Sequence, residues 1–245
     1  MKKYLMMMAL ACGLLMTAEA QERKVDEFTT KNGKKVAITC IKHASMQINY
    51  NGVEIQVDPV GMLVKPETDY ALFPKANIIL VTHEHKDHFD REAIASLRTA
   101  ATTIYVNQAV YNMFKHGLVL RNGDKVDYAD DISIEAVPAY NTTPGREQFH
   151  PKGRDNGYVL TLDGLRIYIA GDTEDIPEMA GLKDIDIAFL PCNQPYTMTP
   201  DQLVSAAKTI KPKVLFPYHY SQTPVAKVAL MLAGSGIDVR IRQYQ

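Results

Sequence analysis

Hydrophobic and polar positions in the early part of the chain predict antiparallel strands. The runs KVAITCI (35–41), SMQINYN (45–51) and VEIQVDP (53–59) are strand-like, and Asn51-Gly52 between the last two is typical of a hairpin turn. Residues 21–34 are polar, and we expect a short lead-in there. The domain is therefore predicted to begin as an antiparallel sheet.

From Ala76 the pattern changes to apolar runs that alternate with helical segments. NIILVT (77–82) is uniformly apolar, as expected for a strand covered on both faces. A helix over 91–98 follows, with Asp90 as its N-cap. The next segments predict a strand at 102–106, a helix over 108–116 and two strands within 125–140.

The second half of the chain repeats this alternation after a long polar loop at 141–156. A hairpin over 157–172 turns at Asp163-Gly164, and a strand at 186–191 leads to a helix over 199–210. That helix has a capping box and one apolar face, formed by Leu203, Ala206, Ala207 and Ile210. A strand from 213, a helix over 225–234 and a strand over 238–244 close the chain. This order predicts an α/β protein, with two sheets face to face and helices outside.

The N-terminus has the layout of a secretory signal peptide. Two lysines precede an apolar stretch over 4–16 and then Ala18-Glu19-Ala20, so cleavage is expected after Ala20. The stretch is shorter than the about 20 residues that a membrane span needs. Lipidation at Cys12 is the alternative, but the hydrophobic segment continues past this residue. We expect a single domain over 21–245, located in the periplasm or secreted, with no stable membrane span after cleavage.

Charge and cysteine content narrow the possible partners. The formal net charge is −1, and removal of two lysines and one glutamate with the signal peptide makes it −2. Nucleic-acid partners usually require a basic excess, so we expect none. Cys40 and Cys192 lack CxxC spacing and are predicted to be small buried residues, neither in a disulfide nor on a metal. Composition leaves a homo-oligomer open.

The candidate chemistry lies where apolar strands end. Three such strands lead to His83, Asp172 and His219, and α/β sheets place their sites at these ends. A lone histidine or aspartate there is more often a capping residue, but THEHKDH (82–88) holds three of the seven histidines within six positions. His83 and His85 project to the same side of an extended segment, while Asp87 and His88 face a neighbouring position. The segment therefore predicts two adjacent metal sites.

These motifs resemble those of the metallo-β-lactamase superfamily. THEHKDH matches its H-x-H-x-D-H signature, and AGDT (170–173) and PYHY (217–220) resemble its bridging-aspartate and last-histidine motifs. QVDP resembles its first motif, in which an aspartate, here Asp58, orients ligands. HAS (43–45), LPCNQPYTMTPDQ (190–202) and PYHY are similar to small metal-dependent hydrolases related to ascorbate-phosphate lactonase.

The resemblance implies an αββα sandwich of two mixed sheets flanked by helices, with up to two zinc ions. His83 and His85 are expected on the first ion, Asp87, His88 and His219 on the second, and Asp172 between them. Manganese or iron would also suit such ligands. The implied function is hydrolysis of a small ester, lactone or phosphoester by a metal-held hydroxide, with Asp87 and Asp172 as the catalytic residues.

One position departs from the superfamily pattern. The third histidine of the first ion normally stands at a strand end that here reads VPAYNTT, so Asn141 occupies its place. Asparagine binds zinc poorly. We expect His150 from the long loop to be the substitute, with a weak site or a water as alternatives. His43 is expected to be either a substrate contact or a buried, hydrogen-bonded histidine.

Other readings remain open at this point. HEHKDHFD is also similar to phospholipase D-like members, which would make the chain a lipid phosphodiesterase. Hydrolysis of β-lactams is disfavoured by the GDT motif without a nearby cysteine ligand. A non-catalytic metal-binding scaffold would explain the missing histidine, although the retained Asp87 argues against it. We assign no role to His116, at the end of its predicted helix, and expect core packing for most of Tyr140, Tyr196, Tyr218 and Tyr220.

Overall fold

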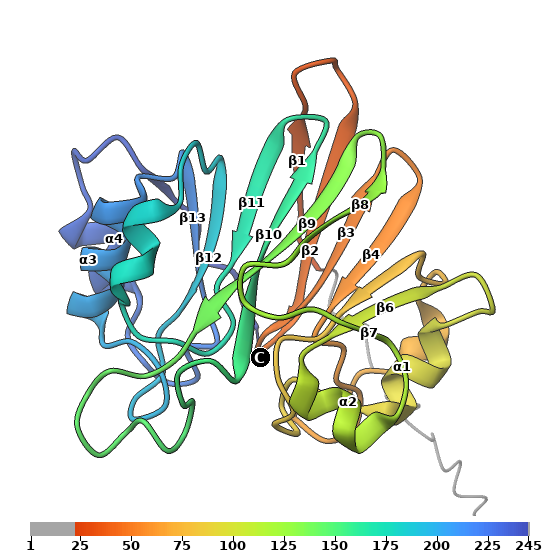
Figure 1. The fold of residues 1–245 in the computed structure, drawn as a ribbon. Helices are drawn as coiled ribbons and strands as arrows, with labels where there is room; N and C mark the ends of the chain where they lie inside the picture. The colour runs from red at the N-terminus through yellow and green to blue at the C-terminus, as the bar shows by residue number, and fades with distance from the viewer. Residues whose placement is uncertain (1–22, 245) are drawn as a thin grey trace, which may run out of the picture.

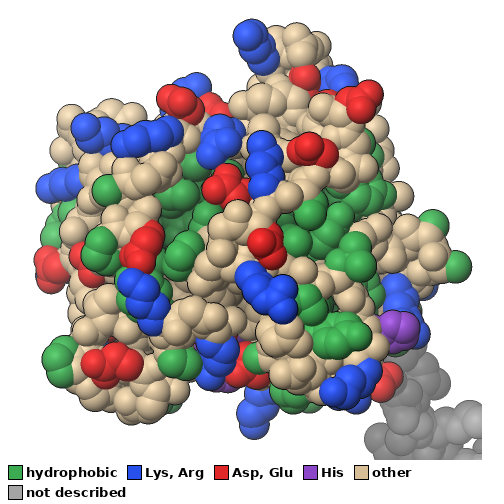
Figure 2. Space-filling view, viewed as in Figure 1, with side chains coloured by type: hydrophobic (Ala, Val, Ile, Leu, Met, Phe, Trp, Pro, Cys, Tyr) green, Lys and Arg blue, Asp and Glu red, His purple; other side chains and the backbone are tan. Residues whose placement is uncertain are grey.

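The computed structural model describes residues 23–244 (Figure 1). The expected signal peptide, its cleavage point at Ala20 and the alternative at Cys12 lie outside these residues. None of the helices within 23–244 has the length and hydrophobicity needed to cross a bilayer. On the face shown in Figure 2, positively and negatively charged side chains are interspersed.

The first sheet has seven strands in chain order. It is antiparallel from β1 to β4 and parallel from β4 to β7. The hairpin predicted at Asn51-Gly52 is present, with both residues at positive φ. The strands are β1 (Val25–Thr29), β2 (Lys35–Lys42), β3 (Ser45–Tyr50), β4 (Val53–Val57), β5 (Ile78–Leu80), β6 (Thr103–Val106) and β7 (Leu118–Val119).

The second sheet also has seven strands, and its order is the reverse of the chain order. It is antiparallel from β8 to β11 and parallel from β11 to β14. The strands are β8 (Lys125–Ala129), β9 (Ile132–Ala139), β10 (Asp155–Leu162), β11 (Leu165–Ile169), β12 (Ile187–Pro191), β13 (Val214–Tyr218) and β14 (Asp238–Val239).

The two sheets pack face to face, and helices cover their outer faces. A buried apolar cluster draws on β2 to β5 from one sheet and β9 to β13 from the other. Helices α3 and α4 lie on the outside of the second sheet, and α1 and α2 on the outside of the first (Figure 1). The predicted αββα sandwich is confirmed. The helices are α1 (Arg91–Leu97), α2 (Gln108–Phe114), α3 (Pro200–Ile210) and α4 (Ala226–Met231), with short 3-10 turns η1 (Tyr70–Leu72) and η2 (Pro177–Gly181).

Local sequence signals explain the helix starts. The Asp90 side chain accepts hydrogen bonds from the backbone N–H groups of Glu92 and Ala93, as its prediction as N-cap requires. At α3, Thr199 and Gln202 form the predicted capping box. All four predicted apolar positions of α3 are buried against the second sheet.

The ends of the domain differ from the prediction. Residues 25–29 of the expected lead-in form strand β1, in which Asp26 and Phe28 point inward and the other positions are more exposed. Only two positions of this strand point inward, and one of them is charged. The alternation of apolar and polar residues is therefore too weak to predict a strand from the sequence. The predicted strand over 238–244 pairs only at 238–239, because Arg240 and Arg242 turn towards Asp26 on the other sheet.

Smaller differences concern helix ends, a short strand and a tyrosine. Helix α2 ends at Phe114 with Lys115 in the left-handed conformation, so His116 lies beyond the helix. Helix α4 is also shorter than predicted, and the two-residue strand β7 was not predicted. Tyr196 is 45% exposed, so core packing is wrong for it. Cys40 and Cys192 are buried and free, as predicted.

Candidate metal centre

Parallel strands from both sheets end at the same edge of the sandwich. Asp58 follows β4 and His83 comes three residues after β5, while Asp172 follows β11 and His219 follows β13. Carboxyl ends of parallel strands meet at one edge of a sheet, so the sequence delivers these side chains to a common place. The structure brings together His83, His85, Asp87, His88, His150, Asp172 and His219.

One group of donors consists of His83, His85 and His150. His85 Nδ1 lies 3.1 Å from His83 Nε2 and 3.3 Å from His150 Nε2. Nitrogens about 2.0–2.1 Å from a tetrahedral zinc ion lie roughly 3.3 Å apart. The spacing of these three nitrogens therefore fits a single metal ion.

The second group consists of His43, Asp87, His88 and His219. Asp87 Oδ2 lies 3.5 Å from His219 Nε2, 3.9 Å from His88 Nε2 and 3.1 Å from His43 Nε2. His88 and His219 are buried, whereas the Asp87 side chain is 34% exposed. This group therefore has one open side, at Asp87.

Asp172 joins the two groups. Its Oδ1 lies 3.2 Å from His88 Nε2, and its Oδ2 lies 3.2 Å from His219 Nε2 and 3.4 Å from His150 Nε2. Within residues 23–244, His88 Nε2, His219 Nε2 and Asp172 Oδ1 are buried without a hydrogen-bond partner. Unpartnered buried polar atoms are costly, and a bound cation would satisfy them. The donor set therefore fits a metal on either side of Asp172.

Asp58 orients His88 from behind. Its carboxylate accepts hydrogen bonds from the backbone N–H and hydroxyl of Thr82 and lies 2.8 Å from His88 Nδ1. A carboxylate only accepts, so Nδ1 of His88 carries a proton, and Nε2 is the nitrogen that faces Asp172 and could bind a metal once it has lost its own proton. Thr82 was not singled out in the sequence, although it opens the THEHKDH motif.

His150, and not Asn141, faces the first group. His150 Nδ1 lies 3.1 Å from the carbonyl oxygen of Tyr196, which fixes its proton there and leaves Nε2 free to bind a metal. Asn141 is buried, donates to the same carbonyl at 2.8 Å, and places its own Oδ1 3.3 Å from His150 Nδ1. Asn141 therefore supports the histidine that occupies the expected ligand position.

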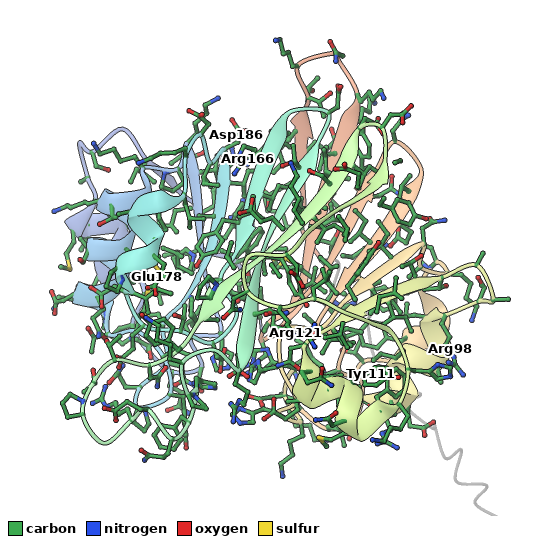
Figure 3. All side chains as sticks on the ribbon, in the orientation of Figure 1. Arg98, Tyr111, Arg121, Arg166, Glu178 and Asp186 are labelled. Carbon is green, nitrogen blue, oxygen red and sulfur yellow. The ribbon has the colours of Figure 1, made fainter. Side chains whose placement is uncertain are left out.

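The loop that carries His150 is fixed at both ends. Buried Glu174 accepts hydrogen bonds from the backbone N–H groups of Thr142 and Thr143, at 2.8 and 2.7 Å, and from both hydroxyls. At the other end Lys152 donates to Glu178, labelled in Figure 3, at 2.8 Å, and Glu178 also accepts from Tyr140, just before the loop, at 2.8 Å. Sequence analysis missed Glu174; its signal was an acidic residue two positions after Asp172.

His43 lies among the residues of the second group. Its ring centroid is 3.7 Å from that of His219, and its Nε2 is within hydrogen-bonding distance of Asp87. His43 is thus partly buried and hydrogen-bonded, and its alternative role as a substrate contact stays a prediction. The backbone φ values of His43, Asp58 and His219 are 49°, 43° and 47°, in the left-handed region. Such strained non-glycine residues cluster at functional sites.

The histidines of the centre differ in their affinity for protons, and His43 differs from His88 and His219 of its own group. Burial lowers the pKa of His150 and of His43 to about 4 and holds the pKa of His83 well below its usual range. Burial acts in the same direction on His88 and His219, but Asp172 outweighs it, raising the pKa of His219 to about 9 and that of His88 well above normal. Asp172 is ionised, since these two histidines overcome the effect of its burial and lower its pKa.

His116 is not part of the centre. It lines a separate surface depression with Arg98, which is labelled in Figure 3 near α1.

Comparison with known proteins identifies the family of the chain. A sequence profile of the beta-lactamase superfamily domain matches residues 37–219. A protein of Ligilactobacillus salivarius named UPF0173 metal-dependent hydrolase is 34% identical over 202 residues, which cover 78% of this chain and 87% of that protein.

Solved structures show the same fold. A protein of Parabacteroides distasonis, provisionally described as a metal-dependent hydrolase, has 54% identity and a TM-score of 0.88, over 91% of this chain and 100% of that one. Igni18, a metallo hydrolase from Ignicoccus hospitalis, has 24% identity and a TM-score of 0.71, over 85% and 95% of the two chains. The profile match, the relatives and the fold together show that the chain belongs to the metallo-β-lactamase superfamily as a metal-dependent hydrolase.

Proposed function

We propose that the chain is an exported hydrolase that uses two zinc ions to cleave a small ester, lactone or phosphoester. The observation that carries this proposal is the pair of donor groups joined by Asp172. His83, His85 and His150 would hold one ion, and Asp87, His88 and His219 the other. Imidazole and carboxylate ligands without thiolates suit zinc, and they also suit manganese or iron.

Two bound metal ions would lower the pKa of a water towards about 7 and polarise the oxygen of the scissile bond. The chain itself contributes orientation. Burial would raise the pKa of Asp87, but the nearby His219 and His43 side chains lower it well below the usual range, so its carboxylate is ionised. On the open side of the centre, an ionised Asp87 can accept a hydrogen bond from the attacking water and align it.

Sequence features support the finer parts of the proposal. The HAS, LPCNQPYTMTPDQ and PYHY motifs are similar to those of lactonase-related hydrolases, which favours a small ester or lactone. The pattern of the first 20 residues supports export.

Elemental analysis of the purified protein tests the metal content. We expect two zinc ions per chain, falling to about one in His150→Ala. His116→Ala is the matched control, because this histidine lies outside the centre, and it should keep two ions. One ion or fewer in the parent, unaffected by His150→Ala, would contradict the two-metal proposal.

A panel of chromogenic esters, lactones and phosphodiesters then tests the reaction. We expect turnover of at least one small ester or lactone, lost on removal of the metal and restored with zinc. Turnover of lipid phosphodiesters alone would favour the phospholipase D-like alternative. Full metal occupancy without any turnover would favour a metal-binding scaffold.

A further inference from the structure

We propose that the C-terminal segment 240–244 is a positioning element of the metal centre that fixes the backbone of His43 and His219. The inference deepens the proposed function, since it concerns the second donor group of the same site. No residue of this segment offers a donor to the metals. It acts through a chain of backbone hydrogen bonds.

The first step is the contact between the segment and His43. The carbonyl oxygen of Tyr244 accepts a hydrogen bond of 2.9 Å from the backbone N–H of His43. The carbonyl of His43 in turn accepts one of 3.1 Å from the backbone N–H of His219. Tyr244 is thus connected to a candidate metal ligand through a single intermediate residue.

The second step is the strained backbone of both histidines. His43 and His219 have φ values of 49° and 47°, a region that non-glycine residues avoid. Such conformations persist only where the surroundings hold them. The hydrogen bonds that His43 donates to the carbonyl of Tyr244 and that His219 donates to the carbonyl of His43 provide this restraint on both residues.

The third step is the anchoring of the segment itself. Asp26 on β1 is buried and accepts hydrogen bonds from Arg240 at 3.0 Å and from Arg242 at 2.6 and 2.7 Å. The buried ring of Tyr244 packs edge-on against the rings of Tyr218 and Tyr220, and its hydroxyl is 2.9 Å from Cys40 Sγ on β2. The segment therefore links the first sheet to the end of β13, which carries His219 (Figure 1).

The fourth step is that the segment affects only the second donor group. A displaced His43 would move its side chain away from Asp87 and from the ring of His219, both in the second group. In the first group His150 is held by the carbonyl of Tyr196 and His83 lies against Thr82, independently of the segment. Loss of the segment should therefore disturb the second group and spare the first.

The test is deletion of residues 244 and 245 from the otherwise complete chain, read by imidazole nitrogen NMR of the metal-free protein. We expect the signals of His43 and His219 to shift or broaden and those of His83, His85 and His150 to stay in place. With zinc bound, a chelator should remove one ion about tenfold faster than in the parent. Tyr244→Phe keeps the carbonyl and the ring, and should resemble the parent.

Asp26→Ala is a second variant that loosens the segment without shortening the chain, in case the deletion does not fold. Its matched control is Asp131→Asn, which removes a carboxylate that binds Lys34 and Tyr50 away from this segment. Unchanged His43 and His219 signals in Asp26→Ala and in the folded deletion variant would overturn the proposal. The NMR readout needs neither substrate nor metal, so absent turnover in the parent would count against the proposed function alone.

Discussion

Asn141 and His150 together replace the histidine that normally provides the third ligand of the first metal ion in the superfamily. His150 supplies the free nitrogen, while Asn141 and the carbonyl of Tyr196 hold its ring. The rotation of an imidazole is set by what its other nitrogen contacts, so such partners affect metal affinity nearly as much as ligands do.

Asn141→Ala should therefore weaken one metal without removing it. We expect two zinc ions at saturating metal, but an affinity for one of them lower by about 10–100-fold. Competition with a chromogenic chelator measures both affinities in one titration. Equal affinities in the variant and the parent would show that Asn141 does not position His150.

The opposite pKa shifts within the centre predict a stability optimum for the metal-free protein. Burial lowers the pKa of His43 and His150 to about 4 from 6.5, so stability is lost as pH falls from about 6.5 to about 4. Burial would also lower the pKa of His219, but Asp172 raises it to about 9. That contribution is present below pH 6.5 and lost as pH rises to about 9.

We therefore expect the metal-free protein to be most stable near pH 6.5. Urea denaturation midpoints of chelator-treated protein between pH 5 and 8.5 measure this. In Asp172→Asn the decline above pH 6.5 should flatten, because the charge that raises the pKa of His219 is gone. A midpoint that rises steadily through pH 8.5 in the parent would contradict the expectation.

At the scale of elements, the loop over 141–154, here called the arm because it carries His150 to the metal centre, is fixed by hydrogen bonds. Glu174 gathers four hydrogen bonds from Thr142 and Thr143 on one carboxylate oxygen, and its side chain is fully buried. Hydrogen bonds to a charged acceptor are stronger than neutral ones. The arm is therefore held near its start, before it reaches His150.

Glu174→Gln should loosen this arm. We expect the free energy of unfolding to fall by about 1–3 kcal/mol, because a neutral amide replaces a buried charged acceptor. The zinc ion held by His150 should bind roughly tenfold more weakly. Thr199→Ala is the matched control: loss of the α3 cap lowers stability by about 1 kcal/mol and leaves both metal affinities unchanged. Equal zinc affinities in Glu174→Gln and Thr199→Ala would contradict the claim that Glu174 fixes the loop that carries His150.

At the scale of the whole molecule, we propose that the chain is exported from the cytoplasm. The full-length chain expressed in a Gram-negative bacterium should be recovered from the periplasm. Mass spectrometry should find Gln21 as its first residue, because Ala18-Glu19-Ala20 fits a signal peptidase site. Recovery of the intact chain from the cytoplasm would contradict export, and a lipid on Cys12 would favour the lipoprotein alternative.

The sequence predicted most of the fold because its strands are strongly apolar and its turns well marked. It failed where the partner of a segment is distant along the chain. Strand β1 carries an inward aspartate that makes sense only beside Arg240 and Arg242, more than 200 positions away.

Within the site, strand-end histidines and aspartates were visible because their residue types are diagnostic of metal binding. His150 was predicted as a substitute ligand, and the structure places it in the first group. The groups that hold it and His43 were not foreseen, because the carbonyls of Tyr196 and Tyr244 could belong to any residue type. Only the folded backbone shows which carbonyl is used.

The ribosome completes the two donor groups at different times, because their residues lie in different parts of the chain. His83, His85 and His150 are all made by the time the ribosome has passed the middle of the chain, whereas the second group waits for His219. The segment 240–244, which we propose restrains His43, is made later still, after His219. A chain cut short by premature termination could thus retain the three histidines of the first group and still lack a working centre. The restraint proposed for His43 therefore forms only after every candidate metal ligand of both groups has been made.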